Sequence, residues 1–249
     1  MIELVNFTKE YKSVFNQKKT AVQNVSFTAK ANSITGLLGP NGAGKTTIIK
    51  AICSIHYPTS GNVFVYDTDG TKYSTSDDIE KAKRLIGYVS ENPHLYRSFS
   101  VIEYLKMTQE IWNCKDENDL QKVIKMFGLK DVLKQKISTL SKGYCQRVSF
   151  ASALIHNPKI LILDEPASGL DPNQIIETRN IIKELSKTKT VLLSTHIMSE
   201  AENLCDNVVI MCEGKLLACD SVENIKKSTK AQNLEQAYIN LTKQKGKND

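Results

Sequence analysis

The sequence has no long hydrophobic run, and no stretch of it approaches the roughly 18 consecutive apolar residues of a membrane-spanning helix. Its six cysteines form no C-x-x-C pair, and no histidines stand at zinc-ligand spacing, which argues against structural zinc and dithiol redox centres. The cysteines are therefore expected to be reduced and mostly buried. Internal repeats and heptad patterns are also lacking, which argues against solenoid and long coiled-coil architectures.

A strong excess of one charge is lacking too. The chain has 33 Lys and Arg against 27 Asp and Glu, a net charge of +6, which could serve nucleic acid, an anionic membrane surface or an anionic substrate. Because the lysines are dispersed, no nucleic-acid partner is expected. Residues 1–5 lack the basic segment and apolar core of a secretory signal, so we expect a cytoplasmic protein, peripheral at the inner face of the membrane where a partner holds it.

At 249 residues, the chain is long enough for one α/β unit with a sizeable core. Alternating apolar and polar residues over the first thirty-five positions predict a small antiparallel sheet. Apolar runs at 159–163 and 190–194 predict strands that are buried on both faces, as in parallel sheets. We therefore predict one domain over residues 1–249. It would contain a mostly parallel α/β core, the N-terminal antiparallel subdomain and a helical subdomain inserted at about 92–157.

Residues 39–47, Gly-Pro-Asn-Gly-Ala-Gly-Lys-Thr-Thr, have the G-x-x-x-x-G-K-T form of a nucleotide-binding P-loop. A predicted strand at 33–38 and a predicted helix from Lys45 to about Ile55 flank the loop, which favours this interpretation over a chance match. The glycines let backbone N–H groups face phosphates, Lys45 reaches the β- and γ-phosphates, and Thr46 places its hydroxyl on Mg²⁺. The predicted nucleotide-binding residues here are Gly39, Asn41, Gly42, Gly44, Lys45, Thr46 and Thr47.

Asp164 and Glu165 follow the apolar run at 159–163, where parallel sheets bind ligands at the carboxyl ends of strands. Neighbouring carboxylates on an extended chain point to opposite sides, so the two are expected to have different roles. Asp164 is predicted to hold Mg²⁺ and Glu165 to act as general base toward the attacking water. An acidic pair at a strand end can also be only a cap or an ion pair.

Two further predictions concern Ser141 and His196. Ser141 and Gly143 begin a predicted helix, where an N-terminus can bind an anion, although a plain N-cap role for the serine is the simpler alternative. His196 follows the buried run at 190–194 and is predicted to lie near the γ-phosphate as a catalytic residue. The alternative for His196 is a satisfied structural histidine.

Together these motifs resemble the ATP-binding cassette (ABC) family over essentially the whole chain. Residues 39–47 resemble its Walker A loop, 160–165 its Walker B strand with the adjoining glutamate, 140–144 its signature and 168–171 its D-loop. The resemblance implies a transporter subunit that hydrolyses ATP with Mg²⁺ and pairs with an identical or different ABC subunit on a membrane permease. In that pairing, ATP on one subunit's P-loop meets Ser141 and Gly143 of the other.

The resemblance also implies individual roles. Tyr11 is expected to stack on adenine, with Phe15 as the competing aromatic, and Asp171 belongs to the D-loop. Three residues depart from the family's usual pattern: Glu91 replaces Gln, Lys142 replaces Gly and Tyr144 replaces Gln. Glu91 is still predicted to meet Mg²⁺, beside Thr46 and Asp164.

Residues 92–96 and 141–147 resemble a bacterial exporter subgroup that includes gliding-motility, sodium-extrusion and copper-related ATPases. We expect the permease to dock in the groove formed by 92–96 and the helices that follow; the alternative is that these side chains pack the helical block onto the core. Two other functions, a soluble ATPase acting on ribosomes or DNA and a P-loop kinase, fit the sequence less well. Soluble relatives acting on ribosomes or DNA carry two cassettes or a long coiled coil, and P-loop kinases need no element like Ser141-Lys142-Gly143.

Overall fold

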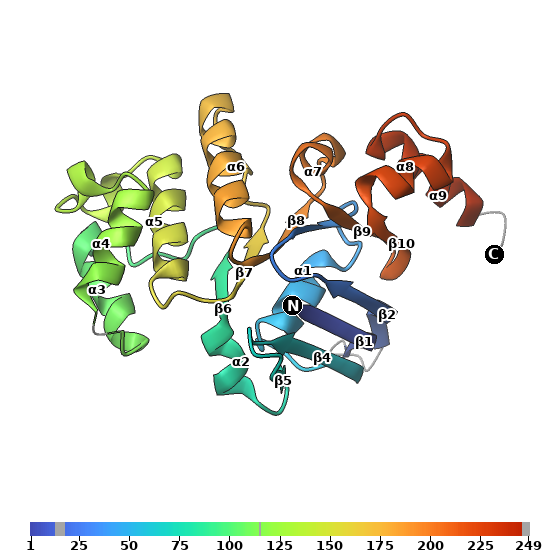
Figure 1. Cartoon of the computed structure of the whole chain (residues 1–249), viewed down its shortest axis with the longest axis horizontal. Coiled ribbons are helices and arrows are strands. Elements are labelled where there is room, and N and C mark those ends of the chain that lie inside the picture. The colour runs from blue at the N-terminus through green and yellow to red at the C-terminus, as the bar shows by residue number, and fades with distance from the viewer. Residues whose placement is uncertain (13–17, 115, 246–249) are drawn as a thin grey trace.

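The computed structural model describes residues 1–12, 18–114 and 116–245. Its N-terminal part contains the predicted antiparallel sheet, in the order β2-β1-β4-β5 (Figure 1). The strands are β1 (Ile2–Lys12), β2 (Lys18–Ala29), β4 (Ser60–Tyr66) and β5 (Lys72–Ser74). In β1, Ile2 and Leu4 are buried while Glu3 and Val5 are less so, because successive side chains of a strand point to opposite faces.

The second sheet has six strands in the order β10-β9-β3-β8-β7-β6. Strands β9, β3, β8, β7 and β6 pair in parallel, and β10 returns antiparallel to β9 through a hairpin turn at Glu213-Gly214. The bounds are β3 (Ile34–Leu38), β6 (Ile86–Val89), β7 (Ile160–Asp164), β8 (Thr190–Thr195), β9 (Asn207–Cys212) and β10 (Lys215–Ser221). The carboxyl ends of the four inner strands β3, β7, β8 and β9 therefore meet at one edge.

Strand β7 shows why the apolar runs are continuous. Ile160 and Ile162 belong to the core that includes the antiparallel sheet and α1 (Lys45–Ile52), whereas Leu161 and Leu163 belong to the core that includes the later helices. Alternate residues thus enter two different hydrophobic cores, and every residue of the strand is buried. Helix α1 accordingly packs between the two sheets.

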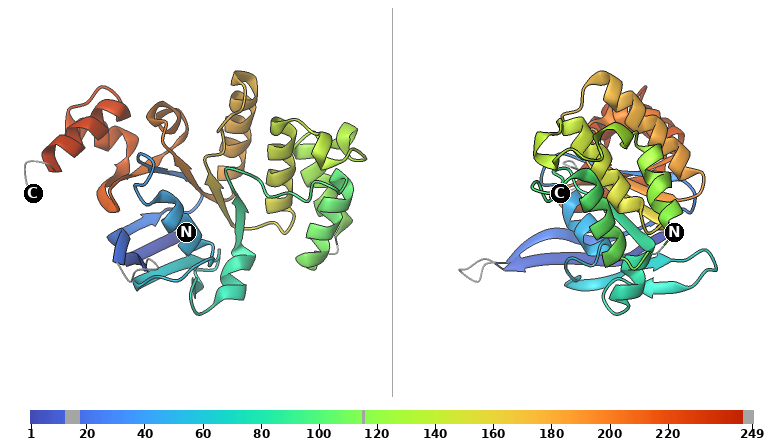
Figure 2. Two further views of the ribbon diagram at one scale, coloured as in Figure 1. Left: turned by 180° about the vertical axis from the view of Figure 1, so that it is seen from behind. Right: turned by 90° about the vertical axis from the view of Figure 1, so that its left-hand side faces the viewer.

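The remaining helices lie around the parallel sheet and at both ends of the molecule (Figures 1 and 2). Their bounds are α2 (Ile79–Leu85), α3 (Val101–Ile111), α4 (Glu117–Met126), η1 (Lys130–Val132), η2 (Ile137–Thr139), α5 (Lys142–Leu154), α6 (Pro172–Ser186), α7 (Met198–Leu204), α8 (Val222–Thr229) and α9 (Leu234–Lys245). Helices α3, α4 and α5 gather at one end, and α8 and α9 at the other.

Two element boundaries differ from the sequence-based predictions. Helix α1 ends at Ile52 rather than near Ile55, because Ser54 adopts a left-handed conformation with φ of 53°. Residues 92–100, at the start of the predicted helical block, are not helical, and α3 begins only after Ser100. The reason is a capping box, in which the Ser100 hydroxyl accepts from Glu103 N–H while the Glu103 carboxylate accepts from Ser100 N–H.

Candidate functional site

The P-loop connects β3 to α1 at the edge where the parallel strands end. Two of its glycines are required by space as well as by conformation. Gly39 has φ of 154°, and a Cβ there would lie 2.4 Å from the Met211 carbonyl oxygen. Gly44 has φ of 102°, and a Cβ there would lie 2.9 Å from the Ala21 carbonyl oxygen. The loop therefore keeps a tight backbone curve that other residues would disrupt.

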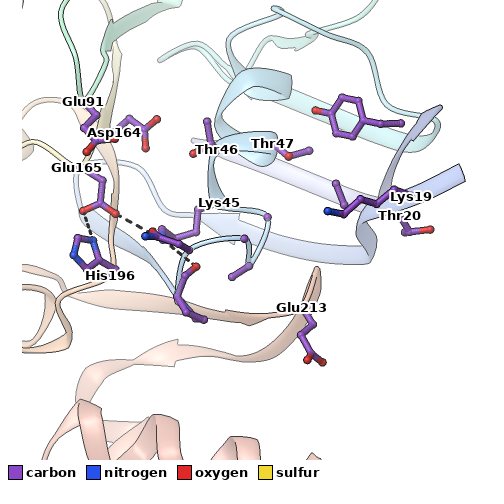
Figure 3. A pocket seen from close by; sticks show the side chains of 17 residues that line it. Lys19, Thr20, Lys45, Thr46, Thr47, Glu91, Asp164, Glu165, His196 and Glu213 are labelled. Carbon is purple, nitrogen blue, oxygen red and sulfur yellow. Dashed lines mark hydrogen bonds and ion pairs between the residues drawn. The ribbon is translucent and has the colours of Figure 1, made fainter. Parts of the chain in front are cut away.

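The Lys45 side chain is buried and its ammonium lies inside this curve. Its Nζ donates to the Gly39 carbonyl oxygen at 2.7 Å and lies 3.7 Å from Glu165 Oε1. The second oxygen of that carboxylate, Oε2, is 3.0 Å from His196 Nδ1. Figure 3 shows this chain of three side chains at one end of the cleft. Glu165 is thus shared by a cation and an imidazole, on a side chain that is only 11% exposed.

The Asp164 and Glu165 side chains have different partners, Ser194 for the first and Lys45 and His196 for the second. The backbone is not extended at Glu165, where φ is 49°. The Ser194 hydroxyl, which belongs to none of the predicted site residues, links the two positions. Ser194 Oγ donates to Asp164 Oδ1 at 2.5 Å and accepts from Glu165 N–H at 3.1 Å. The sequence feature that could have identified Ser194 is its position directly before Thr195-His196. Ser194 is fully buried, and it holds the Asp164 carboxylate and the Glu165 backbone in place.

The electrostatics of the cleft favour a bound cation. Burial raises the pKa of Asp164 above its ordinary value, and the nearby carboxylates of Glu165 and Glu91 raise it further, while the hydrogen bond from Ser194 and the Lys45 ammonium oppose these effects. A divalent cation placed there would lower the pKa of Asp164 and relieve the repulsion among the three carboxylates.

Tyr11 lines the same cleft from β1, with 41% of its surface exposed. Its hydroxyl lies 3.0 Å from His56 Nε2, and the two rings meet edge to face. Burial lowers the pKa of His56, and Lys9 adds to the effect, which favours the neutral imidazole. The hydroxyl contact therefore anchors the Tyr11 ring. The competing aromatic, Phe15, lies outside the described residues.

The cleft has a volume of about 750 Å³ and brings together most of the predicted site residues. They are Tyr11, Asn41, Gly42, Gly44, Lys45, Thr46, Thr47, Glu91, Asp164, Glu165 and His196. Gly39 contributes through its carbonyl group rather than as a lining residue. Three polar lining residues, Lys19, Thr20 and Glu213, were not predicted from the sequence, because isolated polar residues near strand ends carry no motif.

Besides Gly39, three predicted residues do not line this cleft: Ser141, Gly143 and Asp171. The Ser141 hydroxyl caps α5 by accepting from Tyr144 N–H at 3.3 Å, which is the simpler role considered for it. Asp171 caps α6 by accepting from Gln174 N–H at 3.0 Å. The Ser141 cap still leaves the other N-terminal N–H groups of α5 without intrahelical partners. A role of these residues at a nucleotide would therefore have to involve another subunit's cleft.

The parallel sheet, the P-loop between β3 and α1, and the acidic strand end opposite Lys45 together define a P-loop nucleoside triphosphatase. The family model for ABC transporters matches residues 22–168. The chain belongs to the ABC transporter family and is an ATP-hydrolysing subunit of such a transporter. ATP-binding subunits of this family dimerise and work with membrane permeases.

Curated relatives and solved structures agree with this assignment. An uncharacterized ABC transporter ATP-binding protein of Bacillus subtilis, YhcH, is 35% identical over 91% of this chain and 70% of its own length. The bacitracin transport ATP-binding protein BcrA of Bacillus licheniformis is 35% identical over 91% of this chain and 72% of its own. The structure of an ATP-binding subunit of an ABC transporter superposes with a TM-score of 0.85, at 28% identity, over 97% of this chain and 99% of that one.

A dimeric ATP-binding cassette bound to ADP and phosphate in a post-hydrolysis state also resembles the chain. It superposes with a TM-score of 0.78, at 27% identity, over 89% of this chain and 98% of that one. These superpositions confirm the predicted fold class, including the antiparallel N-terminal sheet. Within the residues that the structure describes, no helix is both long and apolar enough to cross a membrane.

Proposed function

We propose that this chain powers an exporter, hydrolysing ATP at two sites shared between paired subunits bound to an integral membrane permease at its cytoplasmic face. The observation that carries the proposal is the contact chain Lys45–Glu165–His196 inside the P-loop cleft, with Ser141 outside it. The bacitracin transport relative supports an exporter. The assignment to a family whose subunits dimerise and serve permeases supports the paired sites and the permease partner. No nucleic-acid partner is proposed.

In the proposed mechanism, Lys45 leaves the Gly39 carbonyl and the Glu165 carboxylate to pair with the β- and γ-phosphates. Glu165 then becomes free to accept a proton from the attacking water, within reach of His196. His196, whose Nδ1 lies 3.0 Å from Glu165 Oε2 here, would then donate a hydrogen bond to the γ-phosphate. Tyr11 offers its ring to the adenine. Each of these motions exchanges one contact seen here for another, so the protein fold need not change.

The donor set of the cleft fits Mg²⁺. Thr46 supplies a hydroxyl and Asp164 and Glu91 supply carboxylates, all lining the cleft beside Lys45. Magnesium prefers oxygen ligands and is usually held by one or two carboxylates together with substrate phosphates. When bound, the ion would neutralise charge on the transferring phosphoryl group. Asp164 accepts a hydrogen bond from the Ser194 hydroxyl, which would keep its carboxylate oriented toward the ion.

Glu91→Gln is expected to weaken the binding of Mg²⁺ modestly. The Mg²⁺ concentration that gives half-maximal hydrolysis should rise by roughly two- to tenfold. The reason is that Glu91 adds negative charge beside Asp164, which attracts a cation. Nucleotide affinity measured without metal should stay the same or improve, because one charge that repels phosphate is gone. The check is a Mg²⁺ titration of ATPase activity beside nucleotide binding in chelator. An unchanged titration would remove Glu91 from the proposed metal site.

We further propose that the permease docks at residues 92–96. This segment borders a groove of about 470 Å³ lined by Asn92, Pro93, His94, Leu95, Arg97, Ile137, Leu140, Lys142 and Cys145. Tyr96 is 59% exposed and rests on Phe99 and Tyr104 with ring centroids 5.6 and 6.2 Å away. An exposed aromatic supported from beneath is typical of an interface anchor. Leu95 also packs against the helical core, so its removal mixes docking with stability.

Tyr96→Ala is therefore the cleaner test of transporter function. We expect the free subunit to keep its melting temperature and basal ATPase, because Tyr96 is mostly exposed. Binding to the permease should weaken by about 2 kcal/mol or more, the cost of truncating an interface anchor. Co-purification from membranes and transport measure this. Ile239→Ala, which truncates a residue that is 43% exposed on α9 at the other end of the molecule, is the control. A destabilised subunit with normal permease binding would place the docking site elsewhere.

A further inference from the structure

The first turn of α5 packs on the segment that follows the acidic strand end. A Cβ built on Gly143 would lie 2.6 Å from three atoms of the Gln174 amide, so this amide covers the glycine face. Gln146 Nε2 donates to the Pro166 carbonyl oxygen at 3.4 Å in a buried contact. Arg147 pairs with Glu177 on α6. These contacts join the signature helix to the residues on both sides of the D-loop, residues 168–171.

Lys142 adds a contact to the D-loop itself. A Cβ built on Gly169 would lie 2.1 Å from Lys142 Nζ, 3.1 Å from its Cε and 3.5 Å from its Cδ. The end of the lysine side chain therefore occupies the space beside Gly169 that a side chain there would need. Gly169 also has φ of 68°, in the left-handed region that favours glycine. Conformation and space together make this position suited to receiving the lysine.

The stability of α5 does not explain a lysine at this position. Lys142 is the first residue of the helix, whose N-terminal end carries a partial positive charge that disfavours a cation. The first turn of α5 contains no acidic residue that would offset it. The end of the side chain instead lies beside Gly169 of the D-loop. The contact with Gly169 is therefore the feature of the structure that accounts for the lysine.

The D-loop is also held from the opposite side. Ser168 Oγ donates to Glu91 Oε1 at 3.4 Å, and Ser168 N–H donates to the Glu165 carbonyl oxygen at 3.0 Å. Consecutive residues, Ser168 and Gly169, thus contact a carboxylate and an ammonium from two different parts of the chain. The Ser168 N–H bond closes a turn that begins at Glu165. The position of the D-loop is therefore linked to the position of the Glu165 backbone, which carries the Glu165 carboxylate.

We propose that Lys142 is a positioning residue that holds the D-loop of its own subunit in place and, through the turn to Glu165, sets the position of that carboxylate for hydrolysis. The part that concerns hydrolysis rests on the function proposed above for Glu165. The part that concerns the loop rests only on the contacts of this chain. The two parts are separable because the order of the D-loop can be measured in the isolated subunit without nucleotide.

Lys142→Met tests the proposal because methionine is unbranched and of similar length but lacks the charge. Hydrogen exchange should become faster for the peptide that contains residues 166–171, where Ser168 and Leu170 N–H groups close turns. The kcat for ATP should fall by about tenfold, as expected for a misplaced catalytic group, while KM changes by less than about twofold. Lys142→Arg keeps the charge and the long stem, and should restore slow exchange and most of the kcat. Lys187→Met, an exposed lysine at the end of α6, controls for loss of one positive charge.

Gly169→Ala provides a second, independent measurement. Its methyl group would occupy the space of the lysine end, so it should displace Lys142. The strain of alanine at φ of 68° is the same with either residue at position 142, and a double-mutant cycle removes it. We expect the effect of Lys142→Met on kcat to shrink from about tenfold in the parent to less than about twofold in the Gly169→Ala background.

Three outcomes would overturn the proposal: unchanged exchange at 166–171 in Lys142→Met, faster exchange with normal kcat, or equal effects of Lys142→Met in both backgrounds. Weaker ATP-driven dimerisation in the Glu165→Gln background, with unchanged exchange in the monomer, would show that Lys142 instead contacts the partner's phosphate. If the proposed function is wrong, a different result is expected. Glu165→Gln would then retain turnover, whatever Lys142→Met does to the exchange of the D-loop.

Discussion

Glu165→Gln is expected to slow ATP hydrolysis by about 10²–10⁴-fold, the usual cost of losing a general base, without loss of ATP binding. An amide has the size of the carboxylate but cannot take a proton from water. Glu165 also carries a negative charge 3.7 Å from the Lys45 ammonium, so its removal should leave that lysine freer to pair with phosphate. Single-turnover hydrolysis measures the loss, and size-exclusion chromatography in ATP should show a trapped dimer.

A charge control and a contrary outcome make this result interpretable. Glu184→Gln removes a carboxylate that is exposed on α6 and paired with Lys187, and it should hydrolyse ATP normally. Normal turnover in Glu165→Gln, with the protein folded and binding ATP, would mean that another carboxylate is the base. Asp164 would then be the next candidate, since it lies on the same strand end and its pKa is raised by burial.

Mixing Lys45→Ala subunits with Ser141→Ala subunits should restore ATPase activity that neither variant shows alone. Ser141 lies outside the cleft that contains Lys45, so each complete site would need the two residues from different subunits. A heterodimer then has one site with both native residues and one site with neither. Because loss of either residue should cost several kcal/mol of transition-state stabilisation, recovery should rise well above the background of each variant. ATPase assays on heterodimers isolated through two tags measure it.

The matched control carries the same two substitutions in a different arrangement. A Lys45→Ala, Ser141→Ala double variant paired with the unsubstituted chain gives a heterodimer in which neither site is complete. This heterodimer should remain inactive although its composition is the same. Equal activity in both heterodimers, or no recovery in the first with heterodimers confirmed, would contradict a site shared between subunits.

The sequence by itself determined the features that depend on neighbouring residues. The glycines and Lys45 of the P-loop have their roles because of a fixed spacing, and Ser141 starts α5 because its hydroxyl can reach an N–H three residues on. The apolar run that became β7 predicted burial on both faces because strand side chains alternate. The predicted end of α1 is about three residues too late, because no local sequence pattern indicates the left-handed conformation of Ser54.

Only the tertiary structure decided which side chains share the cleft and how. Asp164 meets Ser194 because β7 and β8 pair in a register that places these two residues side by side, 30 positions apart in sequence. Glu165 reaches both Lys45 and His196 because three strand ends converge at one edge of the sheet. Lys142 reaches Gly169 because α5 docks on the segment before α6. Periodicity fixes which face a residue occupies but not the register between strands or the docking between helices, since long-range packing sets both.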